Sequence, residues 1–250
     1  MHEQPTNTMV KNIDTERHPF SGSMKMADLV EVNFRILGVM TRLGMRFGFG
    51  DDTVDEACRK NGVDTDTFLL IGNVYTFDNY SPSVEFLRKV NLENIVKYLH
   101  QSHSYYMEIA LRDLEDSIEE MLHCCDSIRK KIIHKFFLDY KDELGRHFEY
   151  EEKTVFPYVE SVLESRGKKD FSILQYEDNH TNVDEKLDDL KSIVMRYLPP
   201  EVDNNLILKV LSNIHVLEVD LRKHTSIEDD ILVPVVKGLE EKIREDGDGR

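Results

Sequence analysis

Two segments of this chain carry the same polar residues at the same spacing. In the first, His147 is followed by Glu151 four residues later and by Pro157 ten residues later. The same three residue types recur 77 positions further on (224 − 147), at His224, Glu228 and Pro234. His103 and His180 are separated by the same interval. The chain therefore contains an internal repeat that relates four histidines and two glutamates.

The spacing of these residues is suited to metal binding. Residues i and i+4 lie one turn apart on the same face of a helix, so each His-x-x-x-Glu segment presents an imidazole and a carboxylate in one direction. Two such segments and two single histidines supply four nitrogen and two oxygen donors, a set that suits iron, zinc or manganese. Two carboxylates are also what a dinuclear centre needs as bridges, and open coordination positions would react with small molecules.

Other interpretations fit the repeat less well. A single His-x-x-x-Glu segment is typical of a solvated pair, and a metal-free helical scaffold would bury two carboxylates without a cation, which is costly. His100 competes with His103 for the first ligand position, and the repeat favours His103 because position 177 is a glutamate. Glu152, Asp184 and Asp229 are expected to be outer hydrogen-bond partners of the ligands or solvated residues.

The elements that must position these residues are helices. Only 12 glycines and 7 prolines occur among 250 residues, and apolar residues follow the 3.6-residue period, so we predict an all-α protein. Four long helical stretches are expected, at residues 92–121, 126–164, 171–198 and 204–242. Their short connections make consecutive helices antiparallel neighbours, which predicts an up-down four-helix bundle.

A small helical domain is expected to precede the bundle. One amphipathic helix is predicted over Met26–Leu43, and a second begins at a capping box formed by Thr53 and Glu56. A third begins at Asp64 or Thr65. The expected organisation is a disordered tail at 1–24, the small domain at 25–76, a linker at 77–90, the bundle at 91–243 and a tail at 244–250.

Composition and charge exclude several classes of function. Lys+Arg 32 against Asp+Glu 48 give a net charge of −16, which argues against a nucleic-acid partner. The mean hydropathy is −0.46, no apolar run approaches the ~18 residues of a membrane span, and no secretory signal pattern is present. The three cysteines form no disulfide framework and favour a reducing compartment. We expect an acidic cytoplasmic protein without a membrane partner.

The repeated segments resemble the two signature helices of the hemerythrin-like (HHE) cation-binding fold. These segments are His147-Phe-Glu-Tyr-Glu-Glu…Phe156-Pro157 and His224…Glu228-Asp-Asp-Ile-Leu-Val-Pro234. The segment from Arg42 to Gly50, followed by Val54-Asp-Glu-Ala-Cys58, is similar to the small domain that precedes the bundle in the repair-of-iron-centres (RIC) family. The resemblance covers residues 26 to 240 and implies a hemerythrin-like four-helix bundle.

This resemblance implies a non-haem protein with two oxo-bridged iron ions. The implied ligands are His103, His147, Glu151, His180, His224 and Glu228, with Glu151 and Glu228 bridging the irons. The RIC family is linked to repair of iron–sulfur centres damaged by nitrosative or oxidative stress, by donating iron or by reacting with nitric oxide or oxygen. Iron–sulfur proteins would then be the clients. The implied chemistry is of a nitric oxide reductase or other oxidoreductase type, and enzyme status stays open.

The alternative function is a module that binds or senses oxygen or nitric oxide without catalysis. Two departures from the family pattern bear on this choice. Gly48 and Phe49 occupy positions where the RIC small domain carries a Cys-Cys pair, which argues against a thiol-dependent step there. Asp184 occupies the position of a fifth histidine in oxygen-carrying hemerythrins, which argues against a dedicated oxygen carrier.

Overall fold

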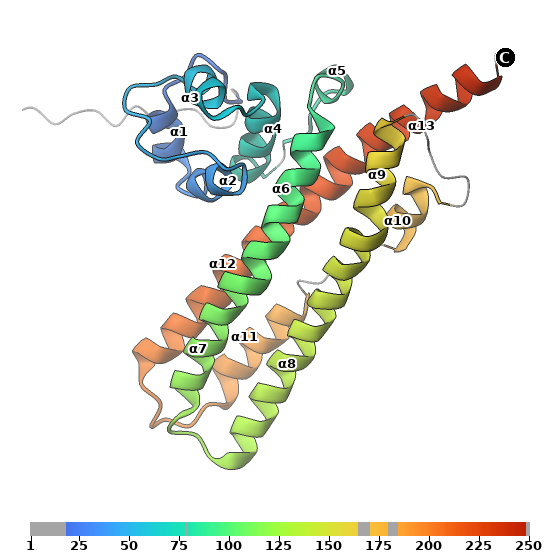
Figure 1. Ribbon diagram of the computed structural model, residues 1–250. Coiled ribbons are helices and arrows are strands. Elements are labelled where there is room, and N and C mark those ends of the chain that lie inside the picture. Colours follow the sequence, from blue (N-terminus) through green and yellow to red (C-terminus); the bar gives the residue numbers. More distant parts are fainter. Residues whose placement is uncertain (1–18, 79, 165–170, 180–184, 249–250) are drawn as a thin grey trace, which may run out of the picture.

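The computed structural model of the protein describes residues 19–78, 80–164, 171–179 and 185–248. Within these ranges the chain is helical and forms no strand beyond an isolated bridge between Lys25 and Thr53, so the all-α prediction is confirmed. Long helices lie along one axis, and a group of short helices packs against one end of them (Figure 1). None of the described helices is long and apolar enough to cross a membrane.

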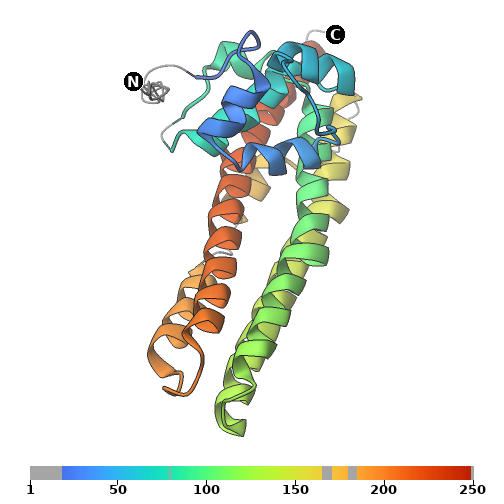
Figure 2. The ribbon, with the colours of Figure 1, turned by 90° about the vertical axis from the view of Figure 1, so that its left-hand side faces the viewer.

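The helices described between Leu92 and Asp248 group into the four stretches of the predicted bundle. Successive stretches run in opposite directions (Figures 1 and 2). The label η denotes a π-helical segment. The first stretch consists of α6 (Leu92–Tyr105), η1 (Tyr106–Ala110) and α7 (Leu111–Leu122). The second consists of α8 (Ser127–Tyr150), η2 (Glu151–Val155) and α9 (Phe156–Leu163). In the last two stretches the elements are α10 (Ile173–Asn179), α11 (Glu185–Tyr197), α12 (Asn204–Ile227), η3 (Glu228–Leu232) and α13 (Val233–Asp248). The side chains of Asp126 and Asp203 accept backbone hydrogen bonds at the starts of α8 and α12, which explains where these helices begin.

Between residues 19 and 91, apart from the undescribed residue 79, five short helices precede the bundle. They are α1 (Met26–Val32), α2 (Ile36–Arg42), α3 (Val54–Asn61), α4 (Thr65–Thr76) and α5 (Val84–Leu87). The predicted capping box is present at the start of α3, where Thr53 and Glu56 bond reciprocally. Asp64 caps α4 by accepting a hydrogen bond from the backbone N–H of Thr67. Local side-chain chemistry therefore determines where these helices start.

The single helix predicted over Met26–Leu43 is wrong, because the helix breaks after Val32. Asn33 has an extended backbone, with φ −144° and ψ 103°. Its side-chain amide donates to the carbonyl oxygen of Tyr75 at 3.0 Å and to the hydroxyl of Thr76 at 3.1 Å. An asparagine that forms such bonds competes with the continuation of its own helix. The break lets α2 turn and pack against α4.

Two clusters of buried apolar side chains fill the part of the protein that the structure describes. The first joins the small helices to the near half of the bundle and includes Leu29, Phe68, Ile95, Val159 and Ile231. The second fills the far half and includes Leu114, Phe137, Leu190 and Ile214. Along α6 and η1 the first cluster gives way to the second between Leu99 and Tyr106, and along α12 between Ile227 and Leu221. The predicted site residues of these two stretches, His103 and His224, lie within these intervals, in a polar layer between the two cores.

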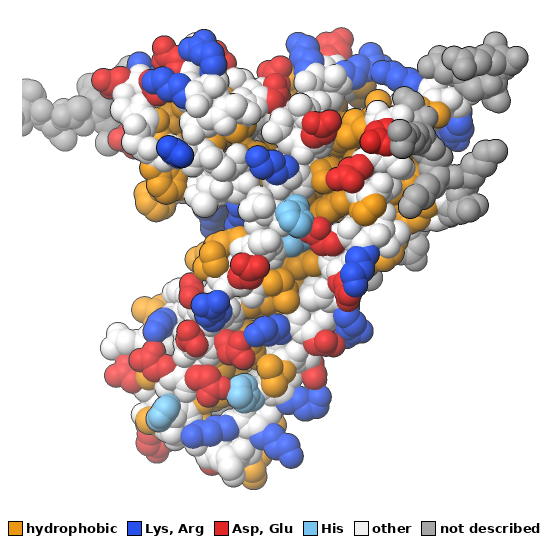
Figure 3. Space-filling model, viewed as in Figure 1, with side chains coloured by type: hydrophobic (Ala, Val, Ile, Leu, Met, Phe, Trp, Pro, Cys, Tyr) orange, Lys and Arg blue, Asp and Glu red, His pale blue; other side chains and the backbone are white. Residues whose placement is uncertain are grey.

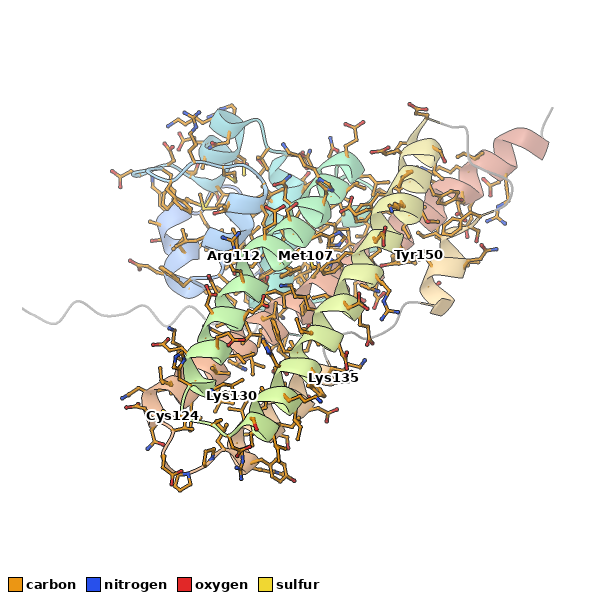
Figure 4. The ribbon with its side chains drawn as sticks, turned by 60° about the horizontal axis from the view of Figure 1, so that its bottom comes forward. Met107, Arg112, Cys124, Lys130, Lys135 and Tyr150 are labelled. Carbon is orange, nitrogen blue, oxygen red and sulfur yellow. The ribbon has the colours of Figure 1, made fainter. Side chains whose placement is uncertain are left out.

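The three cysteines are free, and none of them lies in this polar layer. Cys58 is buried in α3, and Cys125 is buried at the turn between α7 and α8. Cys124 is exposed at that turn, at the end of the bundle remote from the small helices (Figure 4). Acidic and basic side chains are interspersed over the face shown in Figure 3.

Candidate metal centre

Four of the six predicted ligands come together in one buried cluster. His103, Glu151, His224 and Glu228 each offer one ligand atom, and these atoms lie within 4.8 Å of one another. All four side chains are buried, and they come from α6, η2, α12 and η3. Segments that are distant in the sequence therefore direct their donor atoms to a single point inside the bundle.

The inner ring nitrogens of the two histidines face the carboxylates. Nε2 of His103 lies 3.2 Å from Oε2 of Glu151 and 3.2 Å from Nε2 of His224. Nε2 of His224 lies 3.3 Å from Oε1 of Glu228. Imidazole and carboxylate donors thus surround one space, and this mixture of nitrogen and oxygen donors fits iron, zinc or manganese.

His147 lies against the same cluster. Its Nε2 is 3.1 Å from Oε1 of Glu151, and its side chain is only 12% exposed. The predicted i, i+4 relationship therefore places this imidazole and carboxylate side by side. His180, the sixth predicted ligand, and Asp184 lie outside the described residues.

Glu152 connects the cluster to the protein surface. Its Oε1 lies 2.7 Å from Nδ1 of His103, and its Oε2 lies 2.7 Å from Nδ1 of His100. Because Glu152 holds Nδ1, Nε2 of His103 is directed into the cluster. Carboxylates outside a metal site orient metal-binding histidines in the same way. His100, the alternative first ligand, is exposed and is not part of the cluster. The geometry agrees with the outer role predicted for Glu152.

Two buried carboxylates dominate the electrostatics of the cluster, because Glu151 and Glu228 are fully buried. Burial lowers the pKa of His103, but its hydrogen bonds with Glu151 and Glu152 outweigh burial and raise the pKa to about 9. Burial and the charge of Glu228 raise the pKa of Glu151, yet hydrogen bonds with His103 and His147 hold that pKa below its usual range. Protonated His103 therefore offsets one of the two buried negative charges in the metal-free protein, and a bound cation would take over this role.

A buried nitrogen of His224 also fits metal binding. Its Nδ1 has no hydrogen-bond partner within the described ranges, although the ring is almost completely buried. A buried polar atom without a partner costs free energy. Metal coordination by Nε2, which faces His103 and Glu228, would supply binding free energy against that cost, although it would leave Nδ1 itself without an acceptor.

Both glutamates of the cluster start a π-helical segment. η2 begins at Glu151 and η3 begins at Glu228, so the repeat extends to the backbone. In each segment the N–H of the residue that follows, Phe156 or Val233, donates to the carbonyl oxygen of the glutamate five residues earlier. A proline comes next in both copies, and proline lacks the N–H that a regular α-helical turn requires. The helical pattern does not predict these π-segments, which are frequent at functional sites, and the matched prolines are their sequence signal.

Tyr176 contacts the cluster, and nothing in the repeat predicts a role for it. Its hydroxyl donates to Oε1 of Glu151 at 2.7 Å, and its side chain is buried. Burial, together with the charges of Glu228 and Glu151, raises the pKa of Tyr176, so the hydroxyl stays protonated. Its sequence signal is its position four residues before the predicted ligand His180, the same spacing that separates His147 from Glu151.

A buried ion pair joins the small helices to the bundle beside the cluster. Arg42 of α2 pairs with Asp220 of α12, one turn before His224. The guanidinium also donates to two tyrosine hydroxyls, those of Tyr75 and Tyr98. The same guanidinium lies 5.2 Å from the ring of Tyr106, which packs edge-on against His224 with ring centroids 5.5 Å apart. The small helices are therefore linked through side chains to a residue of the cluster.

Comparison with known protein families agrees with this geometry. Residues 94–236 match the hemerythrin HHE cation-binding domain, and this range is more than half of the chain and includes the whole cluster. A comparison with curated proteins found no match. The matched range does not include the small helices α1–α4, so the resemblance to the RIC family stays a prediction. The chain belongs to the hemerythrin HHE cation-binding domain family.

Proposed function

We propose that this protein binds two iron ions and repairs iron–sulfur centres damaged by nitrosative or oxidative stress. The proposed iron ligands are His103, His147, Glu151, His180, His224 and Glu228, with the two glutamates as bridges. The proposal is carried by one observation: donors from both His-x-x-x-Glu segments and from His103 surround one buried space in a chain of a cation-binding family. Iron is one of the metals that such a set of nitrogen and oxygen donors binds well.

Bound iron would supply redox and Lewis-acid chemistry toward nitric oxide or oxygen. The side chains around the cluster hold the ligands in place. His103 is oriented by Glu152 through Nδ1, and the rings of Phe148 and Phe156 stack on its imidazole at 4.1 Å and 5.4 Å between centroids. A ring held by a hydrogen bond and by stacked aromatic neighbours keeps its Nε2 directed into the cluster. Both phenylalanine side chains are buried, so this side of the site is apolar.

Thiol chemistry is not part of this proposal. Gly48 and Phe49 replace the Cys-Cys pair of the RIC small domain, and Cys58 is buried in α3. The other two cysteines lie at the far end of the bundle (Figure 4). Donated iron would therefore leave from the histidine and glutamate ligands themselves, without a relay of cysteine thiolates.

Sensing of nitric oxide or oxygen is the second candidate function, and one contact favours it. Arg42 and Tyr106 link the small helices to His224, so a change at the cluster could alter how these helices pack. A groove of about 450 Å³ between α2 and the bundle lies beside this link and is lined by Arg42 and Asp220. A partner that responds to the state of the cluster could bind there.

Metal analysis of protein purified without oxygen tests the metal centre. We expect near two irons per chain and near-ultraviolet absorption bands that develop in air. His147→Ala and His224→Ala should each lower the iron content, because each removes an imidazole donor. His215→Ala is the matched control, since His215 is exposed on the same helix as His224. Full iron content in both ligand variants would overturn the proposal.

Repair and sensing differ in what the iron-loaded protein does. Repair predicts that the protein restores the absorbance of a [4Fe–4S] protein that has been treated with nitric oxide, or consumes nitric oxide when a reductant is supplied. Sensing predicts a stable adduct with neither turnover nor restoration. The second result would reject the repair function while leaving the metal centre in place.

A further inference from the structure

We infer that Tyr176 is a positioning residue that fixes the carboxylate of Glu151 for metal binding. The inference rests on the proposed metal centre and adds to it a residue outside the predicted ligand set. The hydroxyl of Tyr176 donates to Oε1 of Glu151 at 2.7 Å, and the tyrosine is only 1% exposed. A buried donor at this distance restricts rotation of the carboxylate about its terminal bond.

The contact with Tyr176 is compatible with a bound metal. Oε1 of Glu151 also lies 3.1 Å from Nε2 of His147, and Oε2 lies 3.2 Å from Nε2 of His103. These two imidazoles would turn their Nε2 lone pairs to a metal and give up their contacts with the carboxylate. The hydroxyl of Tyr176 can stay in place, because each carboxylate oxygen has two lone pairs and one suffices for the metal. Tyr176 can therefore orient Glu151 both with and without metal.

Tyr176 is itself held in place by the start of α10. The backbone N–H of Ile173 donates to Oε1 of Glu240 at 2.8 Å, and Glu240 belongs to α13. Ile173 is fully buried, and Tyr176 follows it after about one helical turn. The hydroxyl is therefore carried by a helix anchored to the bundle at a second point.

The hydrogen bond from Tyr176 has no counterpart at the position that the repeat relates to it. The residue related to Tyr176 is Leu99 (176 − 77), which is buried and has no hydrogen-bond donor in its side chain. The two halves of the repeat therefore differ at this position, since Tyr176 in the second half donates a hydroxyl to Glu151 and Leu99 in the first half has only an apolar side chain. Packing of two similar helical hairpins does not require a tyrosine at one of these positions and a leucine at the other. Orientation of the Glu151 carboxylate does require the tyrosine hydroxyl.

Binding of Co²⁺ to the metal-free full-length chain tests the inference. Tyr176→Phe removes only the hydroxyl, and we expect it to weaken Co²⁺ binding about 10–100-fold and to change the visible absorption of the bound ion. Tyr158→Phe is the matched control, because Tyr158 donates a buried hydrogen bond to Glu240 while the bond from Ile173 to Glu240 remains. The control should keep the wild-type affinity and spectrum. Circular dichroism verifies that both variants are folded.

The outcomes separate the inference from the proposed metal centre. Wild-type affinity and spectrum in Tyr176→Phe would overturn the inference alone. Equal weakening in both tyrosine variants would also overturn it, because loss of any buried hydroxyl would then be sufficient. Absence of Co²⁺ binding by the wild-type chain would overturn the metal centre itself.

A double-mutant cycle provides a second test. If Tyr176 acts through Glu151, the loss of affinity caused by Tyr176→Phe should disappear in a Glu151→Gln background. An undiminished loss in that background would mean that the tyrosine does not act through this carboxylate, and the inference would be wrong.

Discussion

Arg42 and Asp220 form a buried ion pair between the second small helix and the bundle helix that carries His224. Their side chains are 6% and 13% exposed. Tyr106 contacts this pair through its ring, which lies under the guanidinium, and through its hydroxyl, which donates to the carbonyl oxygen of Asp220 at 3.3 Å. Among the described residues, these two charges are compensated by each other and by nearby tyrosines, and the pair adds to the shared apolar core in attaching the small helices.

Arg42→Ala should lower the free energy of unfolding by about 3–5 kcal/mol, because Asp220 would remain buried without its cation. Urea denaturation of the metal-free protein measures this loss. Arg129→Ala is the control, since Arg129 pairs with Asp126 at the surface and its loss should cost at most about 1 kcal/mol. Equal losses in the two variants would contradict the prediction.

Glu152→Ala should weaken Co²⁺ binding about 10–100-fold, because His103 would lose the acceptor that fixes its ring. His100→Ala removes the exposed partner of the same carboxylate and should change the affinity by no more than about fivefold. Titration of both variants measures the difference. A larger effect of the His100 substitution would show that the surface histidine matters more than the orientation of His103.

Cys58 should reduce the stability of the protein at alkaline pH. Burial raises the pKa of its thiol to about 12, above the value of about 8.5 in an unfolded chain. Unfolding then releases a proton above pH 8.5, so the free energy of unfolding falls as pH rises toward 12, by about 2 kcal/mol at pH 10. Denaturation of wild type and Cys58→Ala at pH 8 and pH 10 measures this fall, which should be shallower in the variant. Parallel losses would contradict the raised pKa.

Iodoacetamide should modify Cys124 long before Cys58. Only the thiolate reacts, Cys124 is exposed, and Cys58 is fully buried with a raised pKa. Mass spectrometry of peptides at successive times measures both rates. In urea the two rates should become similar, and a fast reaction of Cys58 in the folded protein would contradict the prediction.

Local patterns account for what the sequence predicts well. His147 and Glu151 are one turn apart, so their proximity follows from helix geometry, and the repeat then relates them to His224 and Glu228. The features that were not predicted depend on contacts between distant segments. The break at Asn33 depends on a bond to Tyr75, 42 residues away. Periodicity within one helix contains no information about such a partner.

Contacts across the bundle were beyond prediction for the same reason. The ion pair of Arg42 with Asp220 spans 178 residues, and neither residue belongs to the repeat. Tyr176 reaches Glu151 because α10 is anchored by Glu240, which lies 67 residues after Ile173. These residues become recognisable as parts of the site only after the helices have been placed in space.

The polar layer separates the two apolar cores within the bundle. It does not coincide with the segment that joins the small helices to the bundle. The small helices share one core with the near half of the bundle, so they should melt together with it as one cooperative unit. The far half has its own core, and buried carboxylates lie between the two. Calorimetry of the metal-free protein should therefore resolve two transitions, with the far half as one of them. A cation bound in the layer would merge them into one, so the ion would determine the cooperativity of folding as well as the chemistry.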